Sequence, residues 1–263
     1  MGQFNNDYFS FDGIYSRKFG YKIISLDDGF ESSFGIDRSI DKEKGVNGDD
    51  IFYGVENNNI NLQVSICKTN DVGVPLAYTR EELNFINRWF FAKKEPLPFE
   101  CDGLIYYVIF IKSTKWSNGA NMGYLTFDME LMNGIAYEPV KVIEKKIEYC
   151  DYIYLYNDST ATDIIYPNYE FKFISGIEGS SNYIIITNET TGQVIEINGI
   201  KVGERIIVDN NIKDMRSENS IYKNIYKQSN GEWLYLVSGR NVLRIDCHEC
   251  DFKIKYQNKM GLI

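Results

Sequence analysis

Hydrophobic and polar residues alternate along many short stretches of the chain, and this period of two predicts β-strands. In "INLQVSI" (60–66) every second residue is apolar, and "YLTFDMEL" (124–131) repeats the pattern. Each stretch should be a strand with one face in a core and the other in water. The run "LIYYVIFI" (104–111) is apolar throughout, which favours a central strand that is buried on both faces.

One stretch has a helical period instead. In "YTREELNFINRWFFAKKEP" (78–96) large apolar residues recur every three or four positions, so they share one face of a helix. The members of this face are Leu83, Phe85, Ile86, Trp89 and Phe90. Thr79 and Glu82 have the spacing of a capping box, in which each side chain accepts a hydrogen bond from the other residue's backbone. We predict an amphipathic helix over 79–92 that is inserted into a β framework and packs through its apolar face.

After Pro139 the strand pattern starts afresh. Short stretches such as "DYIYLYN" (151–157) and "DFKIKY" (251–256) are separated by turn residues, which is typical of an antiparallel sandwich. Asn198-Gly199 predicts a tight hairpin turn between "QVIEI" and "IKV". Because Pro139 interrupts strand pairing and both flanks have complete patterns, we predict a mainly β protein with two β-sandwich domains, 1–139 and 140–263.

Composition supports this fold class and disfavours two kinds of partner. A chain of 263 residues, 44% of them hydrophobic, can fill two cores, and its 20 Tyr and 16 Phe residues suit half-buried strands. The formal net charge of -9 argues against a general phosphate-binding surface, so nucleic acid is not an expected ligand. No run approaches the roughly 20 apolar residues of a membrane helix, and the start "MGQFNNDYF" lacks the pattern of a signal peptide. We expect no membrane segment.

Residues with catalytic chemistry are few and scattered. His248 is the only histidine, so any catalytic triad or multi-histidine metal site would depend on it. It lies within the CxxC motif formed by Cys247 and Cys250, which has no second pair to complete a zinc site. We interpret the motif as a turn, with a metal or redox role as the less favoured alternative. Phosphate-binding glycine motifs and the nucleophile elbow are missing, and we expect neither an enzyme nor a cofactor.

Two further features allow a binding interpretation. The acidic pairs Asp27-Asp28 and Asp49-Asp50 lie beside glycines, and paired carboxylates can hydrolyse glycosides. Among 37 acidic residues such pairs arise by chance, so solvated loops are the favoured interpretation. Trp233 could stack on a sugar, although core packing is favoured because its strand is apolar on both faces. A structural protein, a carbohydrate-binding module and a glycan-cleaving enzyme are the competing hypotheses.

A succession of loose motifs runs from residue 9 to residue 137: "FSFDGIYSRKFGYKII", "FYGVENNNINLQVSI", "TREELNFINRWFF" and "EPLPF". In order and spacing they resemble the N-terminal domain of phage distal tail proteins, with Phe11, Gly13, Ser16 and Phe19-Gly20 at the positions of the family's opening motif. The second half resembles the family's galectin-like sandwich and ends with "GEWLYLVSGRNVLRI". One departure is the acidic segment "IDRSIDKEKGVNGDDIF", which we interpret as a loop and which lacks the family's Arg-Gly-rich stretch.

The resemblance implies a structural virion protein, made in the host cytoplasm and located at the distal end of the phage tail. Such proteins form a homo-hexameric ring that joins the tail tube protein to a tail tip or baseplate hub and its receptor-binding proteins. The alternative is a carbohydrate-binding module that recognises host cell-wall glycan through the C-terminal sandwich.

The implied ring would conduct DNA without binding it specifically, so we expect its bore to be neutral or acidic. The candidate lining residues are Asp27, Asp28, Asp49 and Asp50, in two Gly-flanked loops rich in carboxylates. The alternative for these loops is that they face solvent or a neighbouring ring.

Overall fold

The computed structural model describes residues 4, 7–24, 35–118, 120, 122–176, 182–218 and 224–262. It divides into two compact units, the first formed by Met1–Glu138 with Met260–Ile263 and the second by Pro139–Lys259. Each unit contains its own hydrophobic core. The predicted domains were 1–139 and 140–263. In the structure Pro139 belongs to the second unit, and the last four residues belong to the first.

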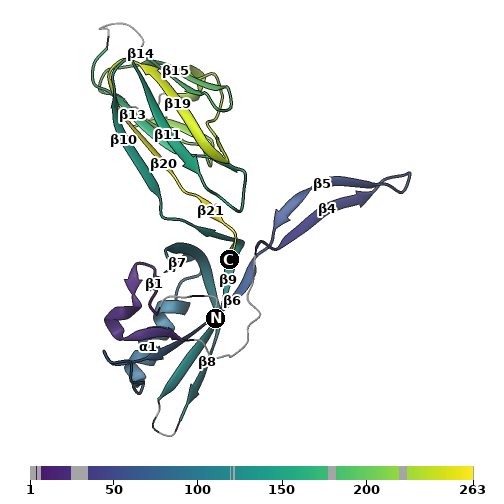
Figure 1. The fold of residues 1–263 in the computed structure, drawn as a ribbon, viewed down its shortest axis with the longest axis vertical. Helices are drawn as coiled ribbons and strands as arrows, with labels where there is room; N and C mark the ends of the chain where they lie inside the picture. Colours follow the sequence, from purple (N-terminus) through teal and green to yellow (C-terminus); the bar gives the residue numbers. More distant parts are fainter. Residues whose placement is uncertain are drawn as a thin grey trace. The chain divides into compact units, whose positions relative to one another are not determined.

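The first unit is built on one eight-stranded sheet with the order β2-β1-β7-β8-β9-β6-β3, in which β21 also pairs with β9 (Figure 1). The strand bounds are Ser10–Phe11 (β1), Ile14–Tyr15 (β2), Tyr21–Ile24 (β3), Ile60–Lys68 (β6), Leu97–Cys101 (β7), Leu104–Ser117 (β8), Gly123–Tyr137 (β9) and Lys259–Met260 (β21). A separate two-stranded hairpin joins β4 (Arg38–Lys44) to β5 (Asp50–Asn57), and a 3-10 helix, η1, spans Ser16–Phe19. A helix, α1, packs on the eight-stranded sheet, where two stacked sheets were expected.

Strand β6 follows its predicted alternation, with Ile60, Leu62, Val64 and Ile66 buried. Strand β8 has the predicted central position in the sheet but not the predicted burial of both faces. Its residues Tyr106, Val108 and Phe110 are buried in the core that contains α1, whereas Tyr107 and Ile111 are 37% and 54% exposed. The apolar run therefore includes side chains that the rest of the described first unit covers only in part.

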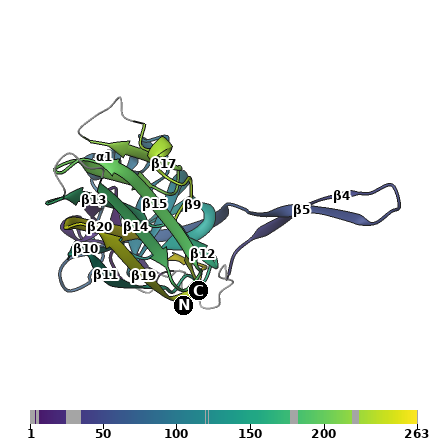
Figure 2. The ribbon, with the colours of Figure 1, turned by 90° about the horizontal axis from the view of Figure 1, so that it is seen from above.

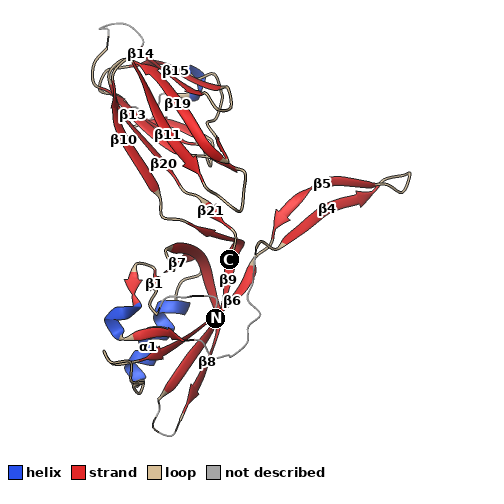
Figure 3. Cartoon of the chain, in the orientation of Figure 1, coloured by secondary structure: helices blue, strands red, loops and turns tan. Residues whose placement is uncertain are grey.

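Helix α1 spans Arg80–Phe91, within the predicted range of 79–92 (Figure 3). The predicted capping box is present: Thr79 Oγ1 accepts a hydrogen bond from the Glu82 amide at 3.2 Å, and Glu82 Oε2 accepts one from the Thr79 amide at 2.8 Å. These bonds satisfy two backbone donors at the first turn, where no intrahelical acceptor is available. No helix among the residues that the structure describes is long and apolar enough to cross a membrane.

The predicted apolar face of α1 points into the first core. Ile86, Trp89 and Phe90 are buried, while Leu83 and Phe85 are partly buried against the same core. The rings of this core pack closely: Phe90 stacks on Phe110 at a centroid distance of 4.4 Å and meets Phe127 edge-on at 4.7 Å. The Trp89 Nε1–H donates to the Phe11 backbone oxygen at 3.0 Å, so the buried indole dipole is satisfied.

The second unit is the expected two-sheet sandwich. One sheet has the order β10-β20-β13-β16-β17 and the other β11-β19-β14-β15, with a small pair formed by β12 and β18 (Figure 1). The bounds are Lys141–Ile147 (β10), Cys150–Asn157 (β11), Ile164–Ile165 (β12), Asn168–Phe173 (β13), Asn182–Asn188 (β14), Gln193–Ile200 (β15), Arg205–Asp209 (β16), Asp214–Ser217 (β17), Leu236–Val237 (β18), Gly239–Cys247 (β19) and Cys250–Tyr256 (β20). A 3-10 helix, η2, spans Tyr226–Gln228. Inward residues of both sheets form one core.

The predicted hairpin turn at Asn198-Gly199 is wrong, because both residues lie inside β15. The register of β14 and β15 shifts there, so that Asn198 and Gly199 together oppose Tyr183 and form a β-bulge. Gly199 has a φ of 70°, whereas Asn198 is not among the residues with positive φ. A type I′ hairpin turn requires positive φ at both positions, whereas a bulge of the glycine-containing G1 type requires it at one.

Replacing Trp89 with Ala should destabilise the protein by about 3–5 kcal/mol, because the change empties a large buried site and leaves the Phe11 carbonyl without its donor. Arg88→Ala is the matched control on the exposed side of the same helix turn and should change stability by about 0.5 kcal/mol or less. Urea unfolding measures both. The assignment of the helix faces is wrong if the two variants rank in the opposite order.

A fragment of residues 139–259 should fold alone, because its core consists only of side chains from within this fragment. A single cooperative thermal transition and dispersed amide NMR signals are the expected results. The complementary fragment 1–138 should be less stable than the same unit in the whole chain, because it lacks Leu262, which is 3% exposed in the first core. An unfolded 139–259 fragment would contradict the division into two independent cores.

Candidate functional site

The hairpin of β4 and β5, residues 38–57, is the most exposed apolar element of the first unit, and we call it the arm. Its strands pair only with each other in the described sheets (Figure 2). Every residue of β4 is exposed, and the large apolar side chains Ile40, Phe52, Tyr53 and Val55 are 62%, 63%, 57% and 49% exposed. A two-stranded hairpin is at best marginally stable alone in water, and exposed apolar groups of this size mark interaction surfaces.

The arm also corrects the expected loop at "IDRSIDKEKGVNGDDIF", which forms two strands and a short turn. Asp49 is exposed in that turn, and Asp50 is the first residue of β5. Lys42 Nζ and Lys44 Nζ lie 2.8 Å and 3.0 Å from the Asp50 carboxylate, and their hydrogen bonds lower the pKa of Asp50. Asp27 and Asp28 lie outside the described residues. The bore-lining role of the four residues stays a prediction.

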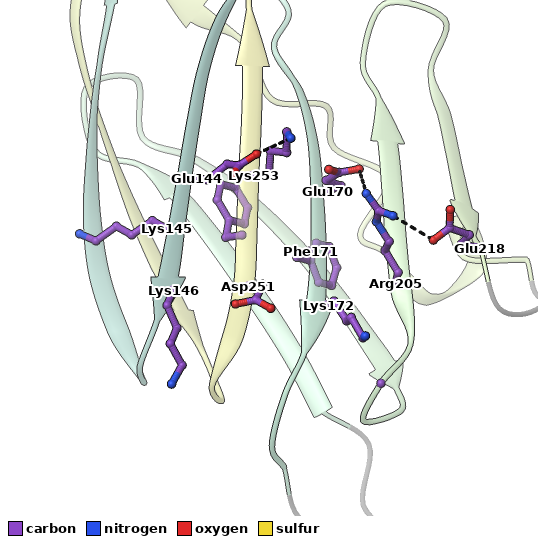
Figure 4. A pocket seen from close by; sticks show the side chains of 12 residues that line it. Glu144, Lys145, Lys146, Glu170, Phe171, Lys172, Arg205, Glu218, Asp251 and Lys253 are labelled. Atoms are coloured by element: carbon purple, nitrogen blue, oxygen red, sulfur yellow. Dashed lines mark hydrogen bonds and ion pairs between the residues drawn. The ribbon is translucent and has the colours of Figure 1, made fainter.

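A concavity of about 580 Å³ lies on the outer face of the five-stranded sheet and is lined mainly by charged side chains (Figure 4). Arg205 binds Glu170 at 2.8 Å and Glu218 at 3.2 Å, and Lys253 binds Glu144. The Lys253 ammonium lowers the pKa of Glu144, and the Glu170 carboxylate raises the pKa of Arg205.

These charges are arranged in cross-strand rows of alternating sign. Glu144, Lys253 and Glu170 are neighbours in register across β10, β20 and β13. The groups neutralise one another, and the two phenylalanines of the lining, Phe171 and Phe252, are buried in the core. The concavity has no exposed ring on which a sugar could stack, and we interpret it as a solvated charged face.

The CxxC motif lies where the chain passes from β19 to β20. The Sγ atoms of Cys247 and Cys250 are 3.3 Å apart, and both side chains are buried in the second core. The hydrogen bond with Cys247, followed by burial, raises the pKa of Cys250, which disfavours a nucleophilic thiolate. The His248 side chain is not part of this thiol pair but lies beside two tyrosines. The centre of its ring is 6.4 Å from the ring centre of Tyr149 and 6.1 Å from that of Tyr183. In the described part of the chain no three potential metal ligands gather.

Trp233 is partly buried against the second core and stacks on Tyr226 at a centroid distance of 6.1 Å. Its backbone oxygen accepts a hydrogen bond from Gln193 Nε2 at 2.6 Å. One ring face is therefore covered by Tyr226, which leaves Trp233 a weak candidate for sugar stacking.

The structure also contains a feature that we did not predict. Tyr152, Tyr154 and Tyr156 project from the outer face of β11, alternating with buried Ile153 and Leu155. The signal is present in "DYIYLYN", whose alternation predicts a strand with tyrosine at every second position. The alternation predicts the strand, and its exposed positions are the three tyrosines.

The described residues thus define a β-rich fold of two units with exposed apolar and aromatic surfaces. The chain belongs to the phage tail protein family: the phage tail protein N-terminal domain matches residues 4–131, and the phage tail C-terminal domain matches residues 135–256. Comparison with curated protein sequences gives no significant match.

Solved structures share the fold at very low sequence identity. The Dit (gp 19.1) protein of phage SPP1, a hub of the adsorption apparatus of phages that infect Gram-positive bacteria, matches with a TM-score of 0.63 and 11% identity, over 95% of this chain and 98% of that one. A chain of the phage P2 baseplate in its activated conformation matches with a TM-score of 0.50 and 8% identity, over 98% and 100% of the two chains. The fold similarity thus extends over both units.

Neither metal nor disulfide should be required for folding, because the two buried thiols lie in an apolar core without further ligands nearby. The protein purified in reductant should melt at the same temperature with and without an added chelator, and contain less than stoichiometric zinc by elemental analysis. Loss of the cooperative transition in reductant, or one zinc per chain, would show that the motif has a structural role.

Proposed function

We propose that this protein is a distal tail hub, in which six copies form a ring that joins the tail tube to the tail tip or baseplate and its host-attachment parts. The family and the fold shared with a phage adsorption hub support a structural role in the tail. The number six and the position at the distal end come from the resemblance to distal tail proteins. In this role the protein is not an enzyme, and its partners are further copies of itself and the neighbouring tail proteins.

The observation that carries the proposal is the arm. Its apolar side chains are exposed in the isolated chain, and hydrophobic burial of roughly 25 cal/mol per Å² would favour their removal from water. An arm seated on a different surface of the next copy makes a heterologous contact, and such contacts close into a ring when the rotation between copies divides a full turn. The arm therefore gives this chain a means of linking successive copies.

The first unit also offers an apolar surface that could receive such an arm. Tyr107 and Ile111 on β8 are 37% and 54% exposed and lie four positions apart along the strand. Together with the partly buried Ile105 and Ile109, they form an apolar region of the central strand. A copy that places its arm there would cover both groups at once.

Light scattering on the purified chain should give the mass of six 30.5 kDa subunits. The double variant Ile40→Asp/Phe52→Asp places charges in the arm contact and should shift the mass toward that of a single chain. The thermal transition of the separated chain should stay cooperative, because both side chains are exposed. The matched control is Ile212→Asp, at a side chain of the second unit that is 73% exposed, and it should keep the ring.

Two results would overturn the proposal. One is a wild-type chain that remains a monomer at the highest attainable concentration, and the other is an arm variant that assembles as well as the control. Negative-stain images distinguish a closed ring from an open filament.

A further inference from the structure

The tyrosine row consists of Tyr152, Tyr154 and Tyr156, and it lies on β11 at the edge of the four-stranded sheet. The three side chains are 39%, 51% and 50% exposed. Because a strand rises about 3.3 Å per residue, neighbouring tyrosines are roughly 6.6 Å apart and the outer two roughly 13 Å apart. The row is a straight line of amphipathic rings, each with an apolar face and a phenolic hydroxyl.

A cation lies beside the middle of the row. Arg240, on the neighbouring strand β19, places its guanidinium carbon 4.8 Å from the centre of the Tyr154 ring. Arg240 is exposed, and no carboxylate of the described residues lies within ion-pair distance of it. Arg244 is different, because Asp246 and Glu189 bind it at 2.8 Å and 3.8 Å. Arg240 thus has donors that remain available for an anionic group.

The surroundings of the row favour a narrow, linear ligand. Beyond β11 the same outer face carries Arg244, Asp246 and Glu196 as well as the half-buried apolar side chains Val242 and Ile185, so the row borders a mixed surface in which charged groups alternate with apolar ones. A stable protein interface usually covers about 800 Å² on each partner and has an apolar centre. Because charged side chains interrupt the apolar ones on this face, it lacks the continuous apolar centre of such an interface.

An extended peptide is also disfavoured, although β11 is an edge strand. Lys145 Nζ donates to the Tyr152 backbone oxygen at 3.0 Å, and the Tyr152 amide donates to Asp151 Oδ1 at 2.8 Å. Both backbone groups of Tyr152 are therefore occupied by side chains, which blocks the addition of a further strand at that position. A ligand that uses the side chains of the row instead of its backbone is consistent with this geometry.

We propose that the tyrosine row binds a linear acidic glycan, with sugar rings packed on Tyr152 and Tyr156 and a carboxylate or phosphate of the glycan bound by Arg240. The phenolic hydroxyls can donate to and accept from sugar hydroxyls, and the guanidinium can bind an anionic oxygen through two donors. The site differs from Trp233 and from the charged concavity, and it does not depend on ring formation. Because the whole chain carries a net charge of -9, general attraction cannot account for binding to a polyanion.

The test is affinity gel electrophoresis of the full chain in polygalacturonate, hyaluronate or alginate, with fully methyl-esterified polygalacturonate as the neutral comparison. At least one acidic polymer should retard the chain, and the neutral one should retard it less. Tyr152→Ala/Tyr156→Ala should weaken binding to that acidic polymer by at least about tenfold. Arg240→Ala should weaken binding to the acidic polymer and leave any binding to the neutral one unchanged. Tyr166→Ala, at a 43% exposed side chain outside the row, is the matched control and should bind like the wild type.

Three results would overturn the glycan site: no retardation by any of the acidic polymers, equal retardation by polyglutamate, or unchanged binding by the double tyrosine variant. Melting temperatures should be unchanged in all variants, because the replaced side chains are exposed. Light scattering on the same samples reports ring formation separately. A chain that forms rings without binding glycan would therefore refute this site alone.

Discussion

The first unit depends on the packing of one helix against one sheet. The only α-helix in the described chain supplies Trp89 and Phe90 to a cluster of rings that includes Phe11 and Phe110. These rings come from β1, α1 and β8, so the contact holds together segments that are far apart in sequence. The hydrogen bond from the Trp89 indole to the Phe11 carbonyl adds a directional constraint to an otherwise non-directional contact. Helix α1 is thus the second layer of the unit.

Strong local signals in the sequence were sufficient to predict the elements that face a core. The alternation in β6 and the capping box at Thr79 each describe a structure that is decided within a few residues. The arm was missed because a strand that faces solvent on both sides has no alternation, and its charged residues are those of a loop. The bulge at Gly199 was interpreted as a turn because both conformations need a residue with positive φ. Only the register of the neighbouring strand distinguishes them.

The exposed surfaces of the candidate site also depend on the fold and could not be predicted from local sequence alone. Exposure of Tyr107 and Ile111 on β8 could not be predicted, because an apolar composition does not reveal whether a second layer covers both faces of a strand. In the second unit the sequence contained every residue of the tyrosine row, but the isolation of Arg240 from carboxylates depends on strand order. The two outer faces of the sandwich differ accordingly. Both carry ion pairs, but only the face of the four-stranded sheet also carries a row of exposed rings beside a guanidinium without an ion-pair partner among the described residues.

The return of the chain from the second unit to the first has a consequence for synthesis on the ribosome. Strand β21, at Lys259–Met260, pairs with β9, and Leu262 is buried in the first core, yet the segment that completes the first unit is made only after the second unit. Between Glu138 and Met260 the ribosome must translate the whole second unit, which takes roughly 6–25 s at about 5–20 residues per second. During that interval the earlier half of the chain lacks part of its own core. The first unit is therefore completed only after the second has been synthesised.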